Sequence, residues 1–301
     1  MSRLDVRVLH SLVKLFGRLP LGFHYAVGSC VSFLAKNVAH YRRDVVMTNL
    51  ARSFPEKKYK ELNAIADRFY SHFGDIFAES IWFSAATYRR LYDSRIATIT
   101  NPELLNEYFN STPSVTVLFS HCGNWELVGG FLAYCTNGGL TVDAGESDVK
   151  VVYKKLHSRF SNEFFLMNRI APLGPGGSEC EVESGDILRY AIGRKGQKTI
   201  YIYIADQSPY KGAHDVGEFL HQPTKGMLGS VKVAHKLGHS VLYMGMRMLE
   251  RGKYEIYFEP ISPDASREEP EQMLRTYFDM LEKDICEQPY NWLWTHRRWK
   301  R

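Results

Sequence analysis

Cysteine is scarce in this sequence, and the cysteines present form no recognisable pairs. Five cysteines are scattered along 301 residues, and none belongs to a C-x-x-C motif. An odd number without regular spacing argues against a disulfide scaffold and against a structural zinc site. We therefore expect a protein of a reducing compartment whose fold rests on its apolar core.

Several other signals of specialised chemistry are also missing. The sequence holds no G-x-S-x-G motif, so the activated serine of an α/β-hydrolase is not indicated. His235 and His239 have the spacing of two metal ligands, yet Gly238 predicts the end of their helix and no nearby carboxylate completes a site. Gly174–Gly177 resembles a phosphate-binding loop, but the G-x-G-x-x-G pattern fails at Glu179. We expect neither a bound metal nor a cofactor.

Charge is unevenly distributed, although its total is small. The chain carries 38 Lys and Arg against 33 Asp and Glu, a formal net charge of +5. Residues 1–60 contribute +8 and residues 296–301 contribute +4, so the residues between them carry −7. Such a surface is directional, and it does not indicate nucleic-acid binding. With 45% hydrophobic residues the chain can bury a large core.

Long hydrophobic runs of the kind that span membranes are absent near the N-terminus. Leu19–Ala35 lacks Asp, Glu, Lys and Arg over 17 residues. As a helix it would be roughly 26 Å long, which is short of the roughly 30 Å hydrocarbon core of a bilayer. No short apolar run followed by a small-residue cleavage site predicts a signal peptide.

The residues around this stretch are basic and amphipathic. One interpretation is an ordinary amphipathic helix followed by a buried one. The other is a helix that lies in or dips into a membrane interface, held by apolar burial and anionic lipid, with a marginal span as its extreme form. We favour the interfacial helix, and we assign residues 1–40 to a membrane-associating segment and residues 41–301 to a single domain. The flanking cations are Arg3, Arg7, Lys14, Arg18, Lys36, Arg42 and Arg43, and the apolar positions at helical spacing are Leu4, Val8, Leu12, Leu15 and Phe16.

From about residue 94 the sequence alternates between short β-rich runs and helical stretches, whereas residues 40–93 have the apolar spacing of helices. This alternation predicts an α/β protein in which helices cover a sheet. The expected strands are 95–99, 115–119, 150–153, 198–205, 240–248 and 254–261, and the expected helices are 102–110, 125–136, 156–169, 183–194, 226–238 and 267–288.

The clearest candidate for chemistry is the turn after the expected strand 115–119, where the sequence reads Ser-His121-Cys-Gly-Asn-Trp-Glu126. Catalytic groups of α/β sheets gather at the carboxyl ends of strands. With His121 in the turn and Glu126 in the first helical turn, the carboxylate can fold back to the imidazole and give a general base of fixed tautomer. The alternative is a capping histidine and a glutamate favoured by the helix dipole. At Cys122 we expect a packed thiol rather than a nucleophile.

This turn resembles the H-x4-D/E box of the lysophospholipid acyltransferase superfamily, in particular the branch of late acyltransferases of lipid A biosynthesis. The resemblance continues in order along the chain. Its closing segment, rich in Trp and Arg, either packs in the fold or contacts lipid headgroups. The matching segments are Tyr41–Leu50, Ser53–Glu56, Val152-Tyr-Lys154, Arg169, Ala205-Asp206-Gln207, Phe219–Gly226 and Trp292–Lys300.

The resemblance implies an acyltransferase domain built on a central mixed β-sheet flanked by helices. His121 would take the proton from an acceptor hydroxyl while that oxygen attacks an acyl thioester, and Glu126 would orient the imidazole. Arg169 and Lys154 would hold phosphate or sugar oxygens of the acceptor. By the same resemblance, the remaining substrate-binding candidates are Asn124, Asp206 and Gln207.

The resemblance also implies partners and a location. The acyl donor would be acyl carrier protein, the acceptor a lipid A precursor, and the site of action the cytoplasmic face of the bacterial inner membrane, with peripheral or monotopic attachment or one marginal span. The chain departs from the family at Lys154, where arginine is usual, and at Leu220 and His221. Because lysine offers a point charge instead of a bidentate fork, acceptor recognition could differ. The alternatives are acylation of an amino-acid lipid or a lysophospholipid, a thioesterase, and a non-catalytic membrane-docked scaffold.

Overall fold

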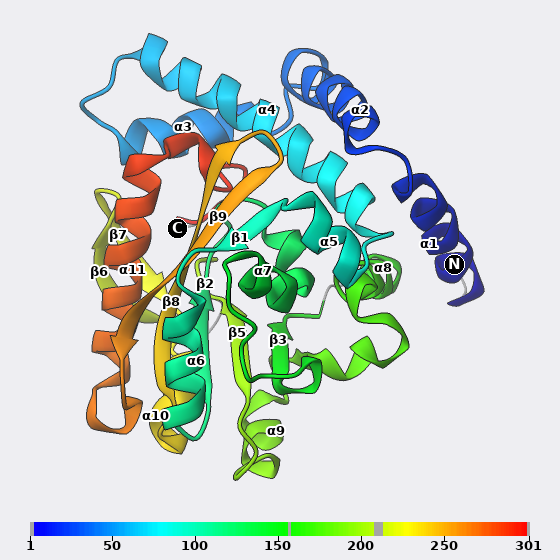
Figure 1. Ribbon diagram of the computed structural model, residues 1–301. Coiled ribbons are helices and arrows are strands. Elements are labelled where there is room, and N and C mark those ends of the chain that lie inside the picture. The colour runs from blue at the N-terminus through cyan, green and yellow to red at the C-terminus, as the bar shows by residue number, and fades with distance from the viewer. Residues whose placement is uncertain (1–2, 156–157, 208–212, 300–301) are drawn as a thin grey trace.

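A seven-stranded β-sheet crosses the centre of the protein in the computed structural model, which describes residues 3–155, 158–207 and 213–299 (Figure 1). Its strands are β1 (Ala97–Ile99), β2 (Val115–Phe119), β3 (Val149–Tyr153), β4 (Glu181–Glu183), β5 (Ile200–Ile204), β8 (Ser240–Glu250) and β9 (Lys253–Ser262). They lie in the order β1-β9-β8-β2-β5-β3-β4. All neighbours are parallel except β8 and β9, so the expected mixed sheet is confirmed. A separate hairpin pairs β6 (His214–Phe219) with β7 (Gln222–Gly226).

Helices cover both faces of this sheet and bury two hydrophobic clusters against it. Leu118 of β2 joins the cluster that includes the helices Arg43–Ser53 and Pro270–Glu287, whereas Val117 and Phe119 join the cluster on the opposite face. Because β2 is buried along its whole length, it forms the continuous apolar run typical of a central parallel strand. The α-helices are α1 (Arg3–Gly17), α2 (Leu21–Phe33), α3 (Arg43–Ser53), α4 (Tyr59–Phe83), α5 (Tyr88–Ser94), α6 (Pro102–Ser111), α7 (Phe131–Asn137), α8 (Arg159–Arg169), α9 (Ile187–Gly193), α10 (Gly229–Leu237) and α11 (Pro270–Glu287).

The expected elements agree with the observed ones except where short strands or a tight turn intervene. The six expected strands are all present, with ends displaced by at most two residues. The expected helix 125–136 is wrong in its first half, which forms the 3-10 helix η2 (Trp125–Gly130) before α7 begins. The expected helix 183–194 starts late because Glu181–Glu183 pairs with β3, and residues 156–157 of the expected helix 156–169 lie outside the described residues.

The N-terminal helices pack along α4 (Figure 1). Gly28 of α2 faces Gly74 of α4 so closely that a Cβ added to Gly28 would lie 2.5 Å from the Gly74 carbonyl oxygen. Ser32, one turn further along α2, donates a hydrogen bond to the Tyr70 carbonyl at 2.7 Å. Two small residues therefore allow two helix backbones to meet. Among the residues that the structure describes, no helix is both long and apolar enough to cross a bilayer.

Replacing Gly28 by alanine is expected to weaken this helix contact, because the new methyl group has no room. We expect a loss of about 1–3 kcal/mol in the free energy of unfolding, the usual cost of overpacking. Gly22 is the matched control on the same helix, since a Cβ there meets nothing within 4 Å. Gly22→Ala should leave stability unchanged or raise it by up to about 1 kcal/mol. Urea denaturation measures both, and equal midpoints for the two variants would contradict the close contact.

Candidate active site

A cleft of about 420 Å³ opens at the carboxyl ends of β2, β3 and β5. Its walls combine polar groups with apolar side chains such as Phe165 and Leu293. Two of the predicted site residues lie behind the cleft instead of lining it, and both are almost fully buried: Asn124 and Asp206. The other five line it: His121, Glu126, Lys154, Arg169 and Gln207.

The register of two parallel strands brings His121 and Asp206 together. Phe119, the last residue of β2, lies opposite Ile204, the last residue of β5. His121 and Asp206 each lie two positions beyond these strand ends, and their side chains therefore meet. The imidazole Nδ1 lies 2.6 Å from Asp206 Oδ1, and the backbone N–H of His121 donates to Oδ2 at 3.1 Å. The carboxylate bonded to the imidazole is thus that of Asp206.

The surroundings of Asp206 keep its carboxyl group ionised. Burial alone would raise the pKa of Asp206, but the adjacent His121 ring and the hydrogen bonds from His121 and Trp292 lower it to about 2. The indole N–H of Trp292 donates to Oδ2 at 2.8 Å. Since an ionised carboxylate only accepts hydrogen bonds, the Nδ1 atom of His121 carries the proton. The contact made by Nε2 then decides whether that nitrogen also carries a proton.

The Nε2 atom of His121 contacts a residue of the cleft wall. The side-chain amide of Gln207 donates to His121 Nε2 at 2.9 Å, which agrees with an unprotonated nitrogen. The Trp125 ring stands edge-on to the imidazole with ring centroids 4.9 Å apart. The imidazole is thus fixed on one edge by Asp206, while its basic nitrogen meets a neutral amide at the cleft wall.

The C-terminal segment holds the turn that carries His121. Gly123 adopts a left-handed conformation with φ of 65°, and an added Cβ would lie 2.6 Å from the side chain of Met246. The Gly123 N–H donates to the Asn291 carbonyl at 3.0 Å, and Cys122 forms an isolated antiparallel bridge with Trp292. Burial raises the pKa of the Cys122 thiol well above its ordinary value, so the expected packed thiol is confirmed.

Glu126 differs from expectation in its contacts, although it lines the cleft. Its Oε1 accepts a hydrogen bond from the Trp125 indole at 3.0 Å, and its Oε2 lies 3.8 Å from an Arg169 guanidinium nitrogen. The expected fold-back of this carboxylate onto the imidazole is not observed among the described residues. The physical reason is that Asp206 occupies the Nδ1 edge of His121, while Arg169 draws Glu126 along the cleft.

Arg169 lies between two carboxyl groups at the cleft wall. Besides Glu126, it faces Glu181 of β4, with 3.5 Å between the Arg169 guanidinium and Glu181 Oε1. Burial raises the pKa of Glu181 to about 8, even though Arg169 acts to lower it. Glu181 therefore holds a proton at neutral pH, which leaves part of the Arg169 charge available to an anion. Lys154, exposed at the mouth of the same cleft, adds a second cation.

Three residues of the described C-terminal segment are buried in the fold. Trp292 is 3% exposed and Trp294 is 0% exposed, and the Arg298 guanidinium donates to the Lys225 carbonyl at 2.6 Å. Burial lowers the pKa of Arg298 to about 10. The alternative in which this cluster contacts lipid headgroups is therefore wrong for these three residues, because their side chains fill space behind Asp206.

Asn124 leads to a residue that sequence reasoning missed. Its side-chain N–H donates to Glu79 of α4 at 2.8 Å, and Glu79 is completely buried. Burial raises the pKa of Glu79 to about 7, although hydrogen bonds from Asn124, Tyr25 and Tyr254 act to lower it. The only signal in the sequence is a carboxylate on the apolar stripe of a helix, and that pattern does not name its partners.

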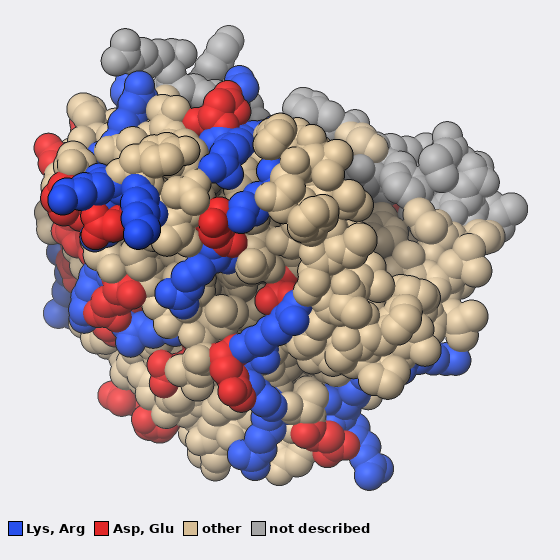
Figure 2. Space-filling view, turned by 90° about the horizontal axis from the view of Figure 1, so that it is seen from above, with Lys and Arg blue, Asp and Glu red and all other residues tan. Residues whose placement is uncertain are grey.

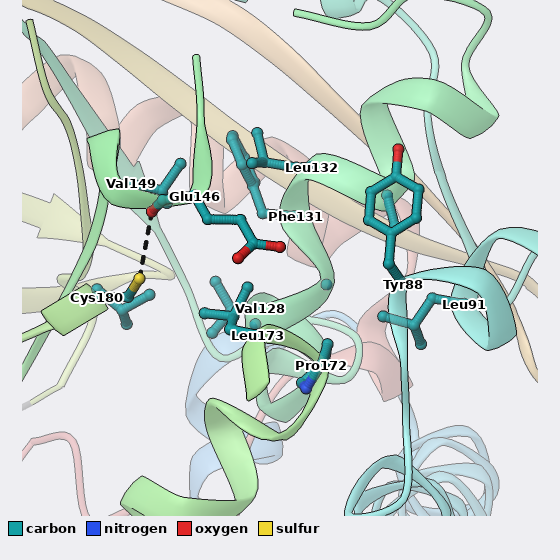
Figure 3. A pocket seen from close by; sticks show the side chains of 14 residues that line it. Tyr88, Leu91, Val128, Phe131, Leu132, Glu146, Val149, Pro172, Leu173 and Cys180 are labelled. Atoms are coloured by element: carbon teal, nitrogen blue, oxygen red, sulfur yellow. Dashed lines mark hydrogen bonds between the residues drawn. The ribbon is translucent and has the colours of Figure 1, made fainter. Parts of the chain in front are cut away.

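A second, narrow cavity adjoins the cleft and shares Val151 of β3 with it. Figure 3 shows its side chains converging from η2, α7, α5 and the segment around Leu173, nearly all of them apolar. Of the described residues that line it, Glu146 is the one with a charge. This apolar space therefore lies directly beside the polar cleft.

The comparison with known proteins gives the family of this chain. Residues 8–301 match the family described as bacterial lipid A biosynthesis acyltransferase. The chain belongs to this family. No curated protein sequence matches it. The resemblance inferred from the sequence is confirmed, and the protein is an acyltransferase. A match of this extent includes both the N-terminal helices and the C-terminal segment that holds the His121 turn.

Glu79→Gln is expected to change how stability depends on pH. The pKa of Glu79 is raised from 4.5 to about 7 in the folded protein, so its contribution to stability is complete below about pH 4.5 and is lost as the pH rises through 7. Between about pH 5.5 and about pH 8, the free energy of unfolding of the wild type should fall by about 2 kcal/mol relative to that of the variant. Urea titrations at both pH values measure this difference. Parallel pH dependences would contradict a buried carboxyl of raised pKa.

Proposed function

We propose that this acyltransferase moves a fatty acyl chain from a thioester of acyl carrier protein to a hydroxyl of a lipid A precursor, with His121 as general base. The observation that carries the proposal is the orientation of His121. Asp206 accepts a hydrogen bond from the Nδ1–H, and Nε2 lies at a cleft that Arg169 and Lys154 also line. A neutral imidazole with a buried carboxylate behind it is the arrangement that general-base catalysis requires.

The reaction proceeds without an acyl-enzyme. His121 Nε2 takes the proton of the acceptor hydroxyl as its oxygen attacks the thioester carbonyl. The tetrahedral intermediate collapses with cleavage of the carbon–sulfur bond, and the imidazolium returns the proton to the departing thiolate. Asp206 stabilises the imidazolium between these steps. The Gln207 amide, which lies 2.9 Å from Nε2, is placed to donate to an oxygen that binds there.

The cations of the cleft fit the acceptor. Arg169 offers a planar guanidinium of 13% side-chain exposure, suited to phosphate or sugar oxygens. Glu126 holds that guanidinium from one side, so we keep Glu126 in the proposed catalytic machinery as the residue that aims Arg169. Lys154 contributes a point charge at the mouth. Asn124 fixes the start of η2, on which both Trp125 and Glu126 stand.

The N-terminal helices support a role at the membrane surface. On α1, Val8, Leu12 and Leu15 are 53%, 59% and 61% exposed, although a helix in water normally buries its large apolar side chains. On α2, Phe23 and Phe33 are 45% and 59% exposed, whereas the buried positions are taken by small or polar residues. The side of the molecule where α1 and α2 lie shows few charged groups in Figure 2.

Basic residues next to these apolar side chains favour anionic lipid. Arg7, Lys14 and Arg18 are exposed on or just after α1. Each cation near an anionic surface adds about 1 kcal/mol to binding. We propose that residues 1–40 rest in the cytoplasmic leaflet of the bacterial inner membrane and bring the cleft to its lipid acceptor.

His121→Ala and Asp206→Asn are expected to abolish or sharply reduce acyl transfer in an assay with acyl carrier protein thioester and a lipid A precursor. Loss of the base removes turnover, and loss of the Asp206 charge should lower kcat by about 10³- to 10⁴-fold, as for other oriented histidines. Glu126→Gln should cost less and act mainly through a higher KM for the acceptor.

Circular dichroism checks that each variant is folded. Full activity of His121→Ala would overturn the base assignment. Thioester loss that proceeds equally without acceptor would indicate hydrolysis instead of transfer.

Phe23→Ser combined with Phe33→Ser is expected to weaken binding to vesicles of phosphatidylcholine and phosphatidylglycerol by about tenfold per residue, because each change removes a large apolar contact with lipid. The matched control is Leu188→Ser combined with Ile192→Ser on α9, which lies far from α1 and α2 (Figure 1). These two side chains are similarly exposed, at 40% and 45%. Vesicle flotation measures binding. Equal binding by the two double variants would contradict the proposed surface.

A further inference from the structure

Helix α4 presents three polar side chains to the interior, one turn apart from each other. His72, Asp75 and Glu79 are 2%, 6% and 0% exposed. Two of the three contact the turn that carries the catalytic residues. His72 Nε2 lies 3.2 Å from the Gly123 carbonyl oxygen, and Glu79 accepts a hydrogen bond from Asn124. Asp75 instead bonds Arg251, outside the site.

Glu79 has a complete set of hydrogen-bond donors. Its Oε2 accepts from Asn124 at 2.8 Å and from the Tyr254 hydroxyl at 2.8 Å, and its Oε1 accepts from the Tyr25 hydroxyl at 2.8 Å. These donors come from η2, β9 and α2, so one carboxyl group joins three parts of the chain. A buried carboxyl group is expensive even when it is well bonded. An apolar residue here would avoid that cost but would leave the three donors without an acceptor, so the carboxyl group and its donors form one unit.

The contact between Glu79 and Asn124 decides which way the Asn124 amide points. An amide has one face that donates and one that accepts. With its N–H on Glu79, the oxygen of Asn124 is left to accept the backbone N–H of Glu126 at 3.2 Å. If the Asn124 amide were reversed, its oxygen would face the carboxyl oxygen of Glu79. Its N–H would face the backbone N–H of Glu126, so that two donors would oppose each other. Glu79 therefore selects the orientation that caps η2.

We propose that Glu79 is a positioning residue for acyl transfer, which fixes the Asn124 amide and through it the start of η2 beside His121. The effect reaches the reaction through Trp125, which packs on the imidazole, and through Glu126, which holds Arg169. The inference rests on the proposed function, since it takes His121 and Arg169 as working residues. Glu79 itself does not reach the cleft.

The proposal is tested by reversing the direction of the hydrogen bond between residues 79 and 124. Asn124→Asp sets a second carboxyl group against Glu79. At a pH above the raised pKa of Glu79, where both groups are ionised and repel each other, this variant is expected to lower kcat by about 10- to 100-fold, as a small misplacement of reacting groups does. Adding Glu79→Gln restores a donor–acceptor pair in the opposite direction, while the residue at 124 still accepts from Glu126. The double variant should therefore regain at least about a third of the wild-type kcat. A double variant no more active than Asn124→Asp overturns the proposal.

Two controls separate the possible failures. Asp75→Asn changes the other buried carboxylate of α4 and should leave kcat within about twofold of the wild type, because Asp75 does not contact the turn. A loss equal to that of Asn124→Asp would mean that α4 acts only through general stability and would overturn the positioning role. His121→Ala reports on the proposed function separately. If His121→Ala keeps its activity, the assignment of His121 as the base fails. If His121→Ala is inactive and Glu79→Gln does not rescue Asn124→Asp, only the role of Glu79 is refuted.

Discussion

The hydrogen bond between His121 and Asp206 is the contact on which the site depends. It exists because β2 and β5 are parallel neighbours that end in register, so the residues two positions beyond their ends face each other. Asp206 stays ionised in a buried place because His121 and Trp292 donate to it. One strand register thus sets the tautomer of the imidazole, and the tautomer sets which nitrogen faces the cleft.

Segments far apart in the sequence converge on the turn that carries His121. The C-terminal segment bonds Gly123 through Asn291 and bonds Asp206 through Trp292, while α4 contacts the same turn through His72 and Glu79. Polar groups buried away from water need such partners, because an unmet donor or acceptor costs about 1–3 kcal/mol. The family match over residues 8–301 includes all of these segments.

Local pattern predicted six of the nine strands that the structure describes, and it placed His121 just after one of them. Apolar runs mark β2 and β5, and the polar residues after them mark the edge of the sheet where chemistry gathers. The partner of His121 was not predictable in this way. The H-x4-E spacing favoured Glu126, whereas the pairing of β2 with β5 joins residues 85 positions apart. The strands β4, β6 and β7 were not predicted, because β4 is only three residues long and because β6 and β7 contain Gly, Pro and charged residues that are unfavourable in strands. The outward face of α2 depends on the contact between Gly28 and Gly74, which amphipathic spacing alone does not reveal.

The central claim is that His121 holds its proton on Nδ1 and that its Nε2, which accepts from Gln207 at the cleft wall, is unprotonated. Nitrogen NMR of the protein labelled in its histidine rings tests this directly, with His121→Ala used to assign the signal. We predict, at neutral pH, a protonated Nδ1 and an unprotonated Nε2 for His121, and a change in this pattern in Asp206→Asn. A proton on Nε2 in the wild type, or a pattern unaltered by Asp206→Asn, would contradict the account.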